Sequence, residues 1–147
     1  MDKIYENILR ELVRDGRISN QSLADRVGLS ASATSRRVAE LERRGVIRGY
    51  RAVTDPKATG RGFATYIAVG LKVHSKEAQK GFERAMAVAD EVVECHNIAG
   101  AFEYLLRVET RDIERYKQFH TEVLATLPQV ASITSHIVME SPKDLRA

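Results

Sequence analysis

Hydrophobic positions in the first 45 residues recur at the helical spacing of about 3.6 residues, in three short blocks. The first block stops at Gly16, the second at Gly28 and the third at Gly45. Ser19 and Ser30 stand where the second and third helices would begin, and a serine side chain there can accept a hydrogen bond from a free amide. Three short helices, with a three-residue connection before the third, predict a helix-turn-helix unit.

After these helices the hydrophobic period changes. Residues 46–55 predict a β-like stretch, which closes at the turn formed by Asp55 and Pro56. A glycine-containing linker follows. We therefore predict two domains, residues 1–62 with the helices and linker, and residues 63–147 with the remainder.

The remainder repeats a strand–helix–strand pattern. An apolar strand begins near Tyr66, and a similar one begins at Tyr104, 38 residues later. Each is followed by an amphipathic helix and by another strand, which opens at Val92 in the first copy and at Val130 in the second. The order βαββαβ predicts a ferredoxin-like antiparallel sheet with both helices on one face. The fold class is therefore α+β, with a winged-type helix-turn-helix domain followed by a ferredoxin-like domain. We expect the uncovered sheet face to be apolar and to mediate dimerisation.

Charge is distributed unevenly along the chain. The net charge is +3, and residues 1–55 carry all of it, with 11 basic and 8 acidic side chains. The rest of the chain is neutral, with 12 of each. Between Arg36 and Arg51 six arginines accompany two glutamates. This asymmetry indicates a polyanion-binding module joined to a neutral one, although charge alone leaves open a merely solvated arginine-rich helix face.

The third predicted helix carries the candidate DNA contacts. Its stripe of Thr34, Val38 and Leu41 turns inward, so its polar side and its small, hydroxylic first turns are exposed. A slim leading end can enter the major groove, although small residues are also ordinary helix caps. Arg36 and Arg37 can reach guanine or phosphate, and the later arginines can reach the DNA backbone. The predicted DNA-binding residues are Ser30, Ser32, Ser35, Arg36, Arg37, Arg43, Arg44 and Arg48.

Catalytic and metal-binding patterns are lacking in the sequence. The four histidines show no metal-ligand spacing, and a single cysteine makes neither a disulfide nor a thiolate zinc site. Cys95 and His96 are neighbours in a predicted strand, so they point to opposite faces and form a poor nucleophile–base pair. We predict no enzyme, no metal and no cofactor. One cysteine and no apolar stretch near the ~20 residues that span a bilayer predict a cytoplasmic protein without a membrane partner.

The ordered motifs of the whole chain resemble the leucine-responsive/asparagine-regulator (Lrp/AsnC) family of transcription regulators. The matching runs are Ile8–Ser19, Leu23–Ser30, Arg37–Tyr50, Glu94–His96, Gly100–Tyr104, Leu127–Val130 and Ile137–Met139. The resemblance implies a sequence-specific regulator that binds double-stranded DNA as a homodimer, an octamer or another even-numbered assembly. It also implies a hinge strand around Gly49–Asp55 that pairs with a partner subunit.

The resemblance further implies a ligand-sensing second domain, in which a small amino acid shifts the assembly state. The implied effector-binding residues are Gly100, Ala101, Phe102, Glu103, Tyr104, Thr134, Ser135 and His136. His136 is a lone strand histidine, a type that also serves structural roles. The family's loop usually reads Gly-Asp-x-Asp-aromatic, whereas this chain has Ala101 and Glu103 at the two acidic positions. One alternative is therefore a nucleoid-like architectural DNA-binding protein without an effector. A small ferredoxin-like enzyme is a more distant alternative.

Overall fold

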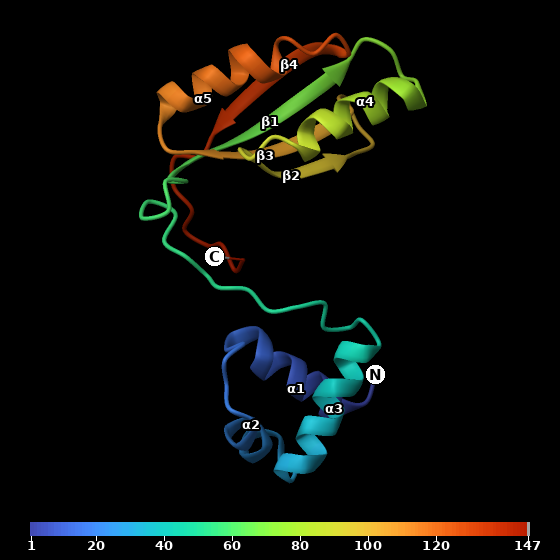
Figure 1. Cartoon of the computed structure of the whole chain (residues 1–147), viewed down its shortest axis with the longest axis vertical. Helices are drawn as coiled ribbons and strands as arrows, with labels where there is room; N and C mark the ends of the chain where they lie inside the picture. The colour runs from blue at the N-terminus through green and yellow to red at the C-terminus, as the bar shows by residue number, and fades with distance from the viewer. Residues whose placement is uncertain (147) are drawn as a thin grey trace. The chain divides into compact units, whose positions relative to one another are not determined.

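The computed structural model describes residues 1–146. The chain divides into two compact units, of which the first spans Met1–Ala52 and the second begins at Val53. Figure 1 shows three helices in the first unit, and a sheet with two labelled helices in the second. The segment before the sheet belongs to the second unit, within which the Arg61 guanidinium donates a hydrogen bond to the Asp90 carbonyl at 3.2 Å.

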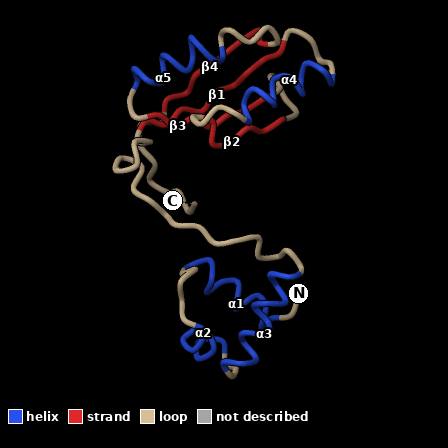
Figure 2. The backbone as a smooth tube through the Cα atoms, in the orientation of Figure 1, coloured by secondary structure: helices blue, strands red, loops and turns tan. Residues whose placement is uncertain are grey.

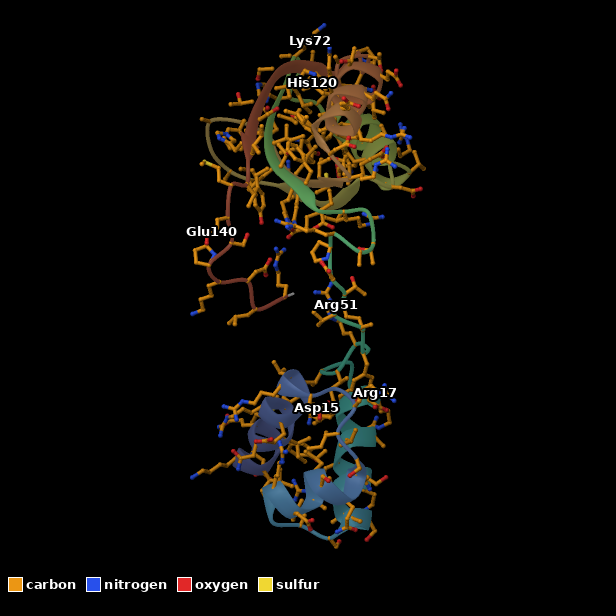
Figure 3. The ribbon with its side chains drawn as sticks, turned by 90° about the vertical axis from the view of Figure 1, so that its left-hand side faces the viewer. Asp15, Arg17, Arg51, Lys72, His120 and Glu140 are labelled. Atoms are coloured by element: carbon orange, nitrogen blue, oxygen red, sulfur yellow. The ribbon has the colours of Figure 1, made fainter. Side chains whose placement is uncertain are left out.

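The first unit consists of three capped helices, as the sequence predicts. They are α1 (Lys3–Arg14), α2 (Asn20–Val27) and α3 (Ala31–Arg43). Ser19 caps α2 and Ser30 caps α3, each through a side-chain oxygen that accepts a backbone N–H. Between α1 and α2, the Asp15 carboxylate accepts the amide of Arg17 at 2.9 Å and shapes the turn (Figure 3). Gly28 ends α2 with φ +72°, a left-handed conformation that favours glycine.

The core of this unit takes one large apolar side chain from each helix. Ile8, Leu23 and Leu41 are buried, and partly buried neighbours surround them. Burial of such a side chain contributes about 1.5–3 kcal/mol. Thr34 is also buried, and its hydroxyl donates to the carbonyl of Ser30. The predicted inward stripe of α3 is therefore confirmed, and packing determines which side of that helix faces the core.

Residues 48–55 form no strand in the single chain, contrary to the β-like stretch that the sequence predicted. A strand needs a neighbouring edge to pair its backbone groups, and no strand is present in residues 1–62, all of which the structure describes. The start of the segment packs on the helices instead. The Tyr50 hydroxyl donates to the Glu42 carboxylate at 2.8 Å, and the tyrosine ring lies against Gly16.

The second unit is the predicted ferredoxin-like fold. Its elements are β1 (Phe63–Leu71), α4 (Lys76–Ala87), β2 (Val92–Asn97), β3 (Tyr104–Thr110), α5 (Ile113–Phe119), the π-helical extension η1 (His120–Leu124) and β4 (Val130–Ile137). The strand order is β2-β3-β1-β4 and all pairings are antiparallel, as the tube in Figure 2 lets the reader follow.

The second core lies between the sheet and its two helices, which cover the same face of the sheet (Figure 1). Alternate residues of the central strands point into it, because side chains in a strand point to opposite faces in turn. The buried cluster comprises Ile67, Val69, Leu71, Phe82, Met86, Tyr104, Leu106, Val108, Tyr116, Phe119 and Leu124. A register shift between Gly70 and Leu71 marks a bulge near the end of β1.

The open face of the sheet is mixed, because Ala68 and Leu105 pair beside polar side chains, and it is less apolar than the sequence predicted. Its central feature is Arg107 on β3, which donates to the Tyr66 hydroxyl and to the Glu109 carboxylate, each at 3.0 Å. Along β3, the buried residues Tyr104, Leu106 and Val108 alternate with residues of the open face, of which Leu105 is apolar and Arg107 and Glu109 are charged. The C-terminal segment after β4, where Glu140 is labelled in Figure 3, borders a cavity of about 870 Å³ with Tyr66 and Arg107.

Candidate nucleic-acid interface and ligand loop

The outward face of α3 carries small and charged side chains. Its exposed residues are Ser32, Ser35, Arg36, Ala39, Glu42 and Arg43. The first turns hold only hydroxyl or methyl groups in addition to the backbone, so this end of the helix is slim. Such an end lets a helix approach the base edges in the major groove, which admits an α-helix.

The entry to α3 is held by hydrogen bonds to its neighbours. The side-chain amide of Asn20, in the first turn of α2, donates to the Ala31 carbonyl at 2.9 Å. The Ser30 hydroxyl accepts the amide of Ala33 at 3.2 Å and lies 3.3 Å from the Ser32 hydroxyl. Ser30, one of the predicted DNA contacts, therefore serves as the helix cap. Ser32 is left as the first hydroxyl of the outward face.

The two adjacent arginines of α3 have different surroundings. Arg36 is exposed and makes no hydrogen bond, ion pair or ring contact with any of residues 1–146. Arg37 points toward α1, where its Nη1 atom lies 3.2 Å from Asp2 Oδ2. Its guanidinium carbon also lies 4.9 Å from the centre of the Tyr5 ring, within the range of a cation–π contact. The structure thus separates a pair of residues that the sequence treated alike.

The remaining predicted basic contacts lie at or beyond the end of α3. Arg43 forms a forked pair with Glu40, with two contacts of 2.8 Å between its Nη2 atom and the carboxylate oxygens. The hydrogen bond from Arg43 lowers the pKa of Glu40, so the carboxylate stays ionised and offsets part of the positive charge. Arg44 and Arg48 are exposed just past the helix. These side chains suit phosphate contacts, which need charge but little directional precision.

The loop between β2 and β3 presents unused amides. The amide of Ile98 donates to the Glu103 carbonyl at 2.9 Å, and the amide of Glu103 donates to the Val69 carbonyl at 3.1 Å, so both ends of the loop are fixed. Within the described chain, the amides between them have no protein acceptor; they belong to Ala99, Gly100, Ala101 and Phe102. A cluster of free amides can hold an anion such as a carboxylate.

Glu103, the one carboxylate of this loop, already has partners. Its Oε2 atom accepts the amide of Leu71 at 2.8 Å, which satisfies the backbone at the β1 bulge. Its Oε1 atom lies 2.8 Å from the Nδ1 atom of His74, a residue outside the predicted ligand site. His74 is far from the loop in sequence, and no local pattern links the two. A ligand ammonium group would have to share or displace these contacts.

The other predicted ligand residues do not form one site. Tyr104 is fully buried, and its hydroxyl donates to Glu83 on α4, so it faces the core instead of the loop. On β4, Ser135 points to the helix-covered face and hydrogen-bonds the Tyr116 hydroxyl. Thr134 and His136 point to the open face, because neighbours in a strand alternate. The structure does not bring this triplet together on one surface.

Other chemistry finds no support in the described residues. No group of three or more His, Cys, Asp or Glu side chains within residues 1–146 is placed to hold a metal ion. Cys95 and His96 pair with successive residues of β3 and so lie on opposite faces, as predicted. Burial raises the pKa of the Cys95 thiol to about 11, which disfavours the nucleophilic thiolate. Among the described helices, none is both long and apolar enough to cross a membrane.

Comparison with known proteins assigns a class to each unit. Residues 1–48 match the model of winged helix-turn-helix DNA-binding domains, and residues 64–147 match that of the Lrp/AsnC ligand binding domain. The leucine-responsive regulatory protein of Escherichia coli K12 is 37% identical over 143 residues, which cover 97% of this chain and 87% of the relative.

Solved structures agree with these matches over the whole chain. A transcriptional regulator of Neisseria meningitidis, solved with L-methionine, superposes with a TM-score of 0.93 at 30% identity, covering 98% of this chain and 93% of the other. A feast or famine regulatory protein of Mycobacterium tuberculosis, also complexed with L-methionine, gives 0.84 at 30% identity, with coverage of 99% and 97%.

A helix-turn-helix unit joined to a ferredoxin-like ligand-binding domain defines a class of DNA-binding transcription regulators. Within that class, the chain belongs to the Lrp/AsnC family, which confirms the resemblance carried by its motifs.

Proposed function

We propose that this regulator reads specific DNA sites through the outward face of α3 and that a small amino acid, bound at the glycine loop, shifts its assembly state. The observation that carries the first part is the slim, exposed N-terminal half of α3, which ends in an unpartnered Arg36. Ser32 and Ser35 are hydrogen-bonding groups at the groove end of the helix. Arg36 can form the forked contact that specifies guanine.

We assign the phosphate contacts to the basic side chains at and just after the C-terminal end of α3. Arg43, Arg44 and Arg48 follow one another from the last turn of α3 into the next segment, and all three are exposed. Their charge supplies affinity without sequence information. We assign this task to the domain of residues 1–62, and ligand sensing and assembly to the domain of residues 63–147.

The effector proposal is supported by the neighbours with L-methionine and by the free amides of the loop. The amides would hold the ligand carboxylate, and Glu103 would receive the ammonium group in competition with His74. We propose that a homodimer exchanges with a larger even-numbered assembly such as an octamer. The ligand would bind one of these two assembly states more tightly than the other. A ligand that prefers one state changes the spacing of the reading helices. We place this regulator in the cytoplasm, where its DNA partner lies.

Selection from a pool of random-sequence duplexes tests the DNA assignment. We expect the protein to enrich one motif, in two half-sites if it binds as a dimer. The Arg36→Ala variant should enrich a motif that is degenerate at one position in each half-site. Enrichment of an identical motif by Arg36→Ala would refute the assignment of base reading to this residue.

A second function is favoured by a specific observation. Ala101 removes one carboxylate of the usual loop, and the remaining one, Glu103, is engaged within the protein. These facts support an architectural DNA-binding protein without an effector. A thermal-shift screen with the common amino acids separates the two functions, because a ligand at 100 times its Kd adds about 2.7 kcal/mol to stability. A shift with any amino acid supports the regulator with an effector, and none supports the architectural protein.

A further inference from the structure

We infer that Arg37 is a positioning residue: it fastens the N-terminal end of α1 to α3 and thereby sets the angle at which α3 presents Arg36 to DNA. The inference rests on the proposed reading role of α3. It reassigns Arg37, which the sequence placed among the DNA contacts, and makes Arg36 the arginine of the pair that determines specificity.

Two contacts hold the Arg37 side chain. Its guanidinium is paired with the Asp2 carboxylate at 3.2 Å and lies over the Tyr5 ring, with 4.9 Å to the ring centre. The side chain is 31% exposed and belongs to a partly buried residue, whereas Arg36 next to it is exposed. Asp2 is itself fixed, because its Oδ1 atom accepts the amide of Ile4 at 2.9 Å and caps α1. The partner of Arg37 is therefore a half-exposed carboxylate that a backbone hydrogen bond also holds in place.

The contacts of Arg37 with Asp2 and Tyr5 matter because the rest of the α1–α3 interface is apolar. Ile8 and Leu41 pack together in the core, and apolar contact has little directional preference. The N-terminal end of α3 is tied to α2 by the Asn20 amide. Near the middle of α3, Arg37 makes the corresponding polar contact with Asp2, the residue that caps α1. Together, the contacts of Asn20 with Ala31 and of Arg37 with Asp2 would define the tilt of α3 as well as its position.

The competing role for Arg37 is a direct phosphate contact. In that case Asp2 would compete with DNA for the guanidinium, and removal of its charge would strengthen binding. If Arg37 acts through its position, the same change would weaken binding. The two roles therefore predict opposite signs for a single substitution at Asp2.

The experiment measures the affinity of the full-length protein for a duplex that it selects from a random pool, over a range of salt concentrations. The main variant is Asp2→Asn, because asparagine caps helices as well as aspartate does but removes the charge. We expect Asp2→Asn to weaken binding roughly twofold to fivefold, as expected for loss of an ion pair of ordinary strength. The slope of log affinity against log salt should stay the same, because no phosphate contact is lost.

Arg37→Ala and the Asp2→Asn/Arg37→Ala double variant complete a cycle. Arg37→Ala should weaken binding more than Asp2→Asn does, again with the salt slope unchanged, and the double variant should be no weaker than Arg37→Ala. If Arg37→Ala fails to fold, as circular dichroism would show, Arg37→Lys replaces it, since lysine keeps the charge and should retain most of the affinity. Tighter binding by Asp2→Asn, or a salt slope lowered by about 0.9 in Arg37→Ala, would overturn the inference.

Arg36→Ala is the matched control. It removes the neighbouring guanidinium without touching α1, so it should relax sequence preference while leaving the melting temperature unchanged. If Arg36→Ala changes neither affinity nor preference, the proposed reading face of α3 is wrong. That outcome is separate from the Asp2→Asn result, which concerns the role of Arg37 alone.

Discussion

The outward face of α3 and the open face of the sheet both carry an arginine, but the two arginines differ in exposure and in partners. On α3, Arg36 is exposed and lacks a partner among the described residues. On the sheet, Arg107 is 13% exposed and is bonded to Tyr66 and Glu109. A guanidinium that is both largely buried and paired, as in Arg107, has little left to offer a phosphate, whereas the exposed and unpaired Arg36 gains from the encounter. The comparison teaches that the exposure and pairing of each arginine, and not the number of charges, distinguish the proposed DNA surface from the sheet face.

The largest expected effect comes from the core that supports the DNA surface. Leu41→Ala should destabilise the helical unit by about 2–5 kcal/mol, because it leaves a cavity where a fully buried side chain stood. DNA binding should be lost at temperatures at which the sheet unit remains folded. The matched control, Leu124→Ala, removes a fully buried side chain from the other core and should destabilise the sheet unit. Calorimetry of the two variants would contradict the comparison if each lowered both transitions equally.

The next effect comes from the exposed arginine itself. Arg36→Ala should weaken binding to the selected duplex by about 1–3 kcal/mol, the value of one forked base contact. Arg84→Ala, an exposed arginine on α4, is the control and should leave the affinity unchanged. Fluorescence anisotropy at fixed salt measures both. Equal losses in the two variants would show that general charge, and not position, determines binding.

A smaller effect is expected at the glycine loop. Glu103→Gln keeps an oxygen that can accept the Leu71 amide but removes the charge that faces His74. Stability should fall by about 1 kcal/mol, as for one weakened hydrogen bond between Glu103 and His74. Any thermal shift produced by L-methionine in the wild type should disappear. Persistence of an unaltered shift in Glu103→Gln would remove this carboxylate from the proposed ligand site.

The smallest expected effect is a pH dependence of the folding stability that comes from Glu94, on the open face of the sheet. Burial raises the pKa of Glu94, but hydrogen bonds from Arg146 and His96 outweigh it, so the pKa lies below its ordinary value of 4.5. The stabilisation is therefore present at neutral pH and lost as the pH falls below about 4.5 toward the lowered value. In urea titrations, Glu94→Gln should be less stable than wild type at pH 7 and approach it at pH 3.5. A difference in unfolding free energy between wild type and Glu94→Gln that stayed constant with pH would exclude this contribution of Glu94 to stability.

Local features of the fold were predictable because their causes are local. Ser19 and Ser30 mark helix starts by their own hydrogen bonds, and the period that brings Leu41 to the core is contained within one helix. The repeat of strand and helix likewise indicated the ferredoxin-like order. The β-like stretch after α3 failed as a prediction because strand formation depends on an edge that the single chain does not provide.

The site was predictable only in part, for a related reason. Arg36 and Arg37 are equivalent in the sequence, and only the fold shows that Asp2, 35 positions away, takes the second of them. The contact between His74 and Glu103 arises from a loop and a strand bulge that no motif marks. The grouping of Ser135 with its neighbours could have been avoided, because the two-residue alternation of a strand already separates them.

The central claim, that α3 and not the sheet faces DNA, is tested most directly by DNA cleavage from a tethered iron chelate. The chelate would be attached to Ser35→Cys or to Thr134→Cys, each in a Cys95→Ser background that removes the native thiol. Ser35 lies on the outward face of α3 and Thr134 on the open sheet face, and both are exposed. We predict localised cleavage of the selected duplex from position 35 and none from position 134. Cleavage from position 134 with none from position 35 would contradict the account.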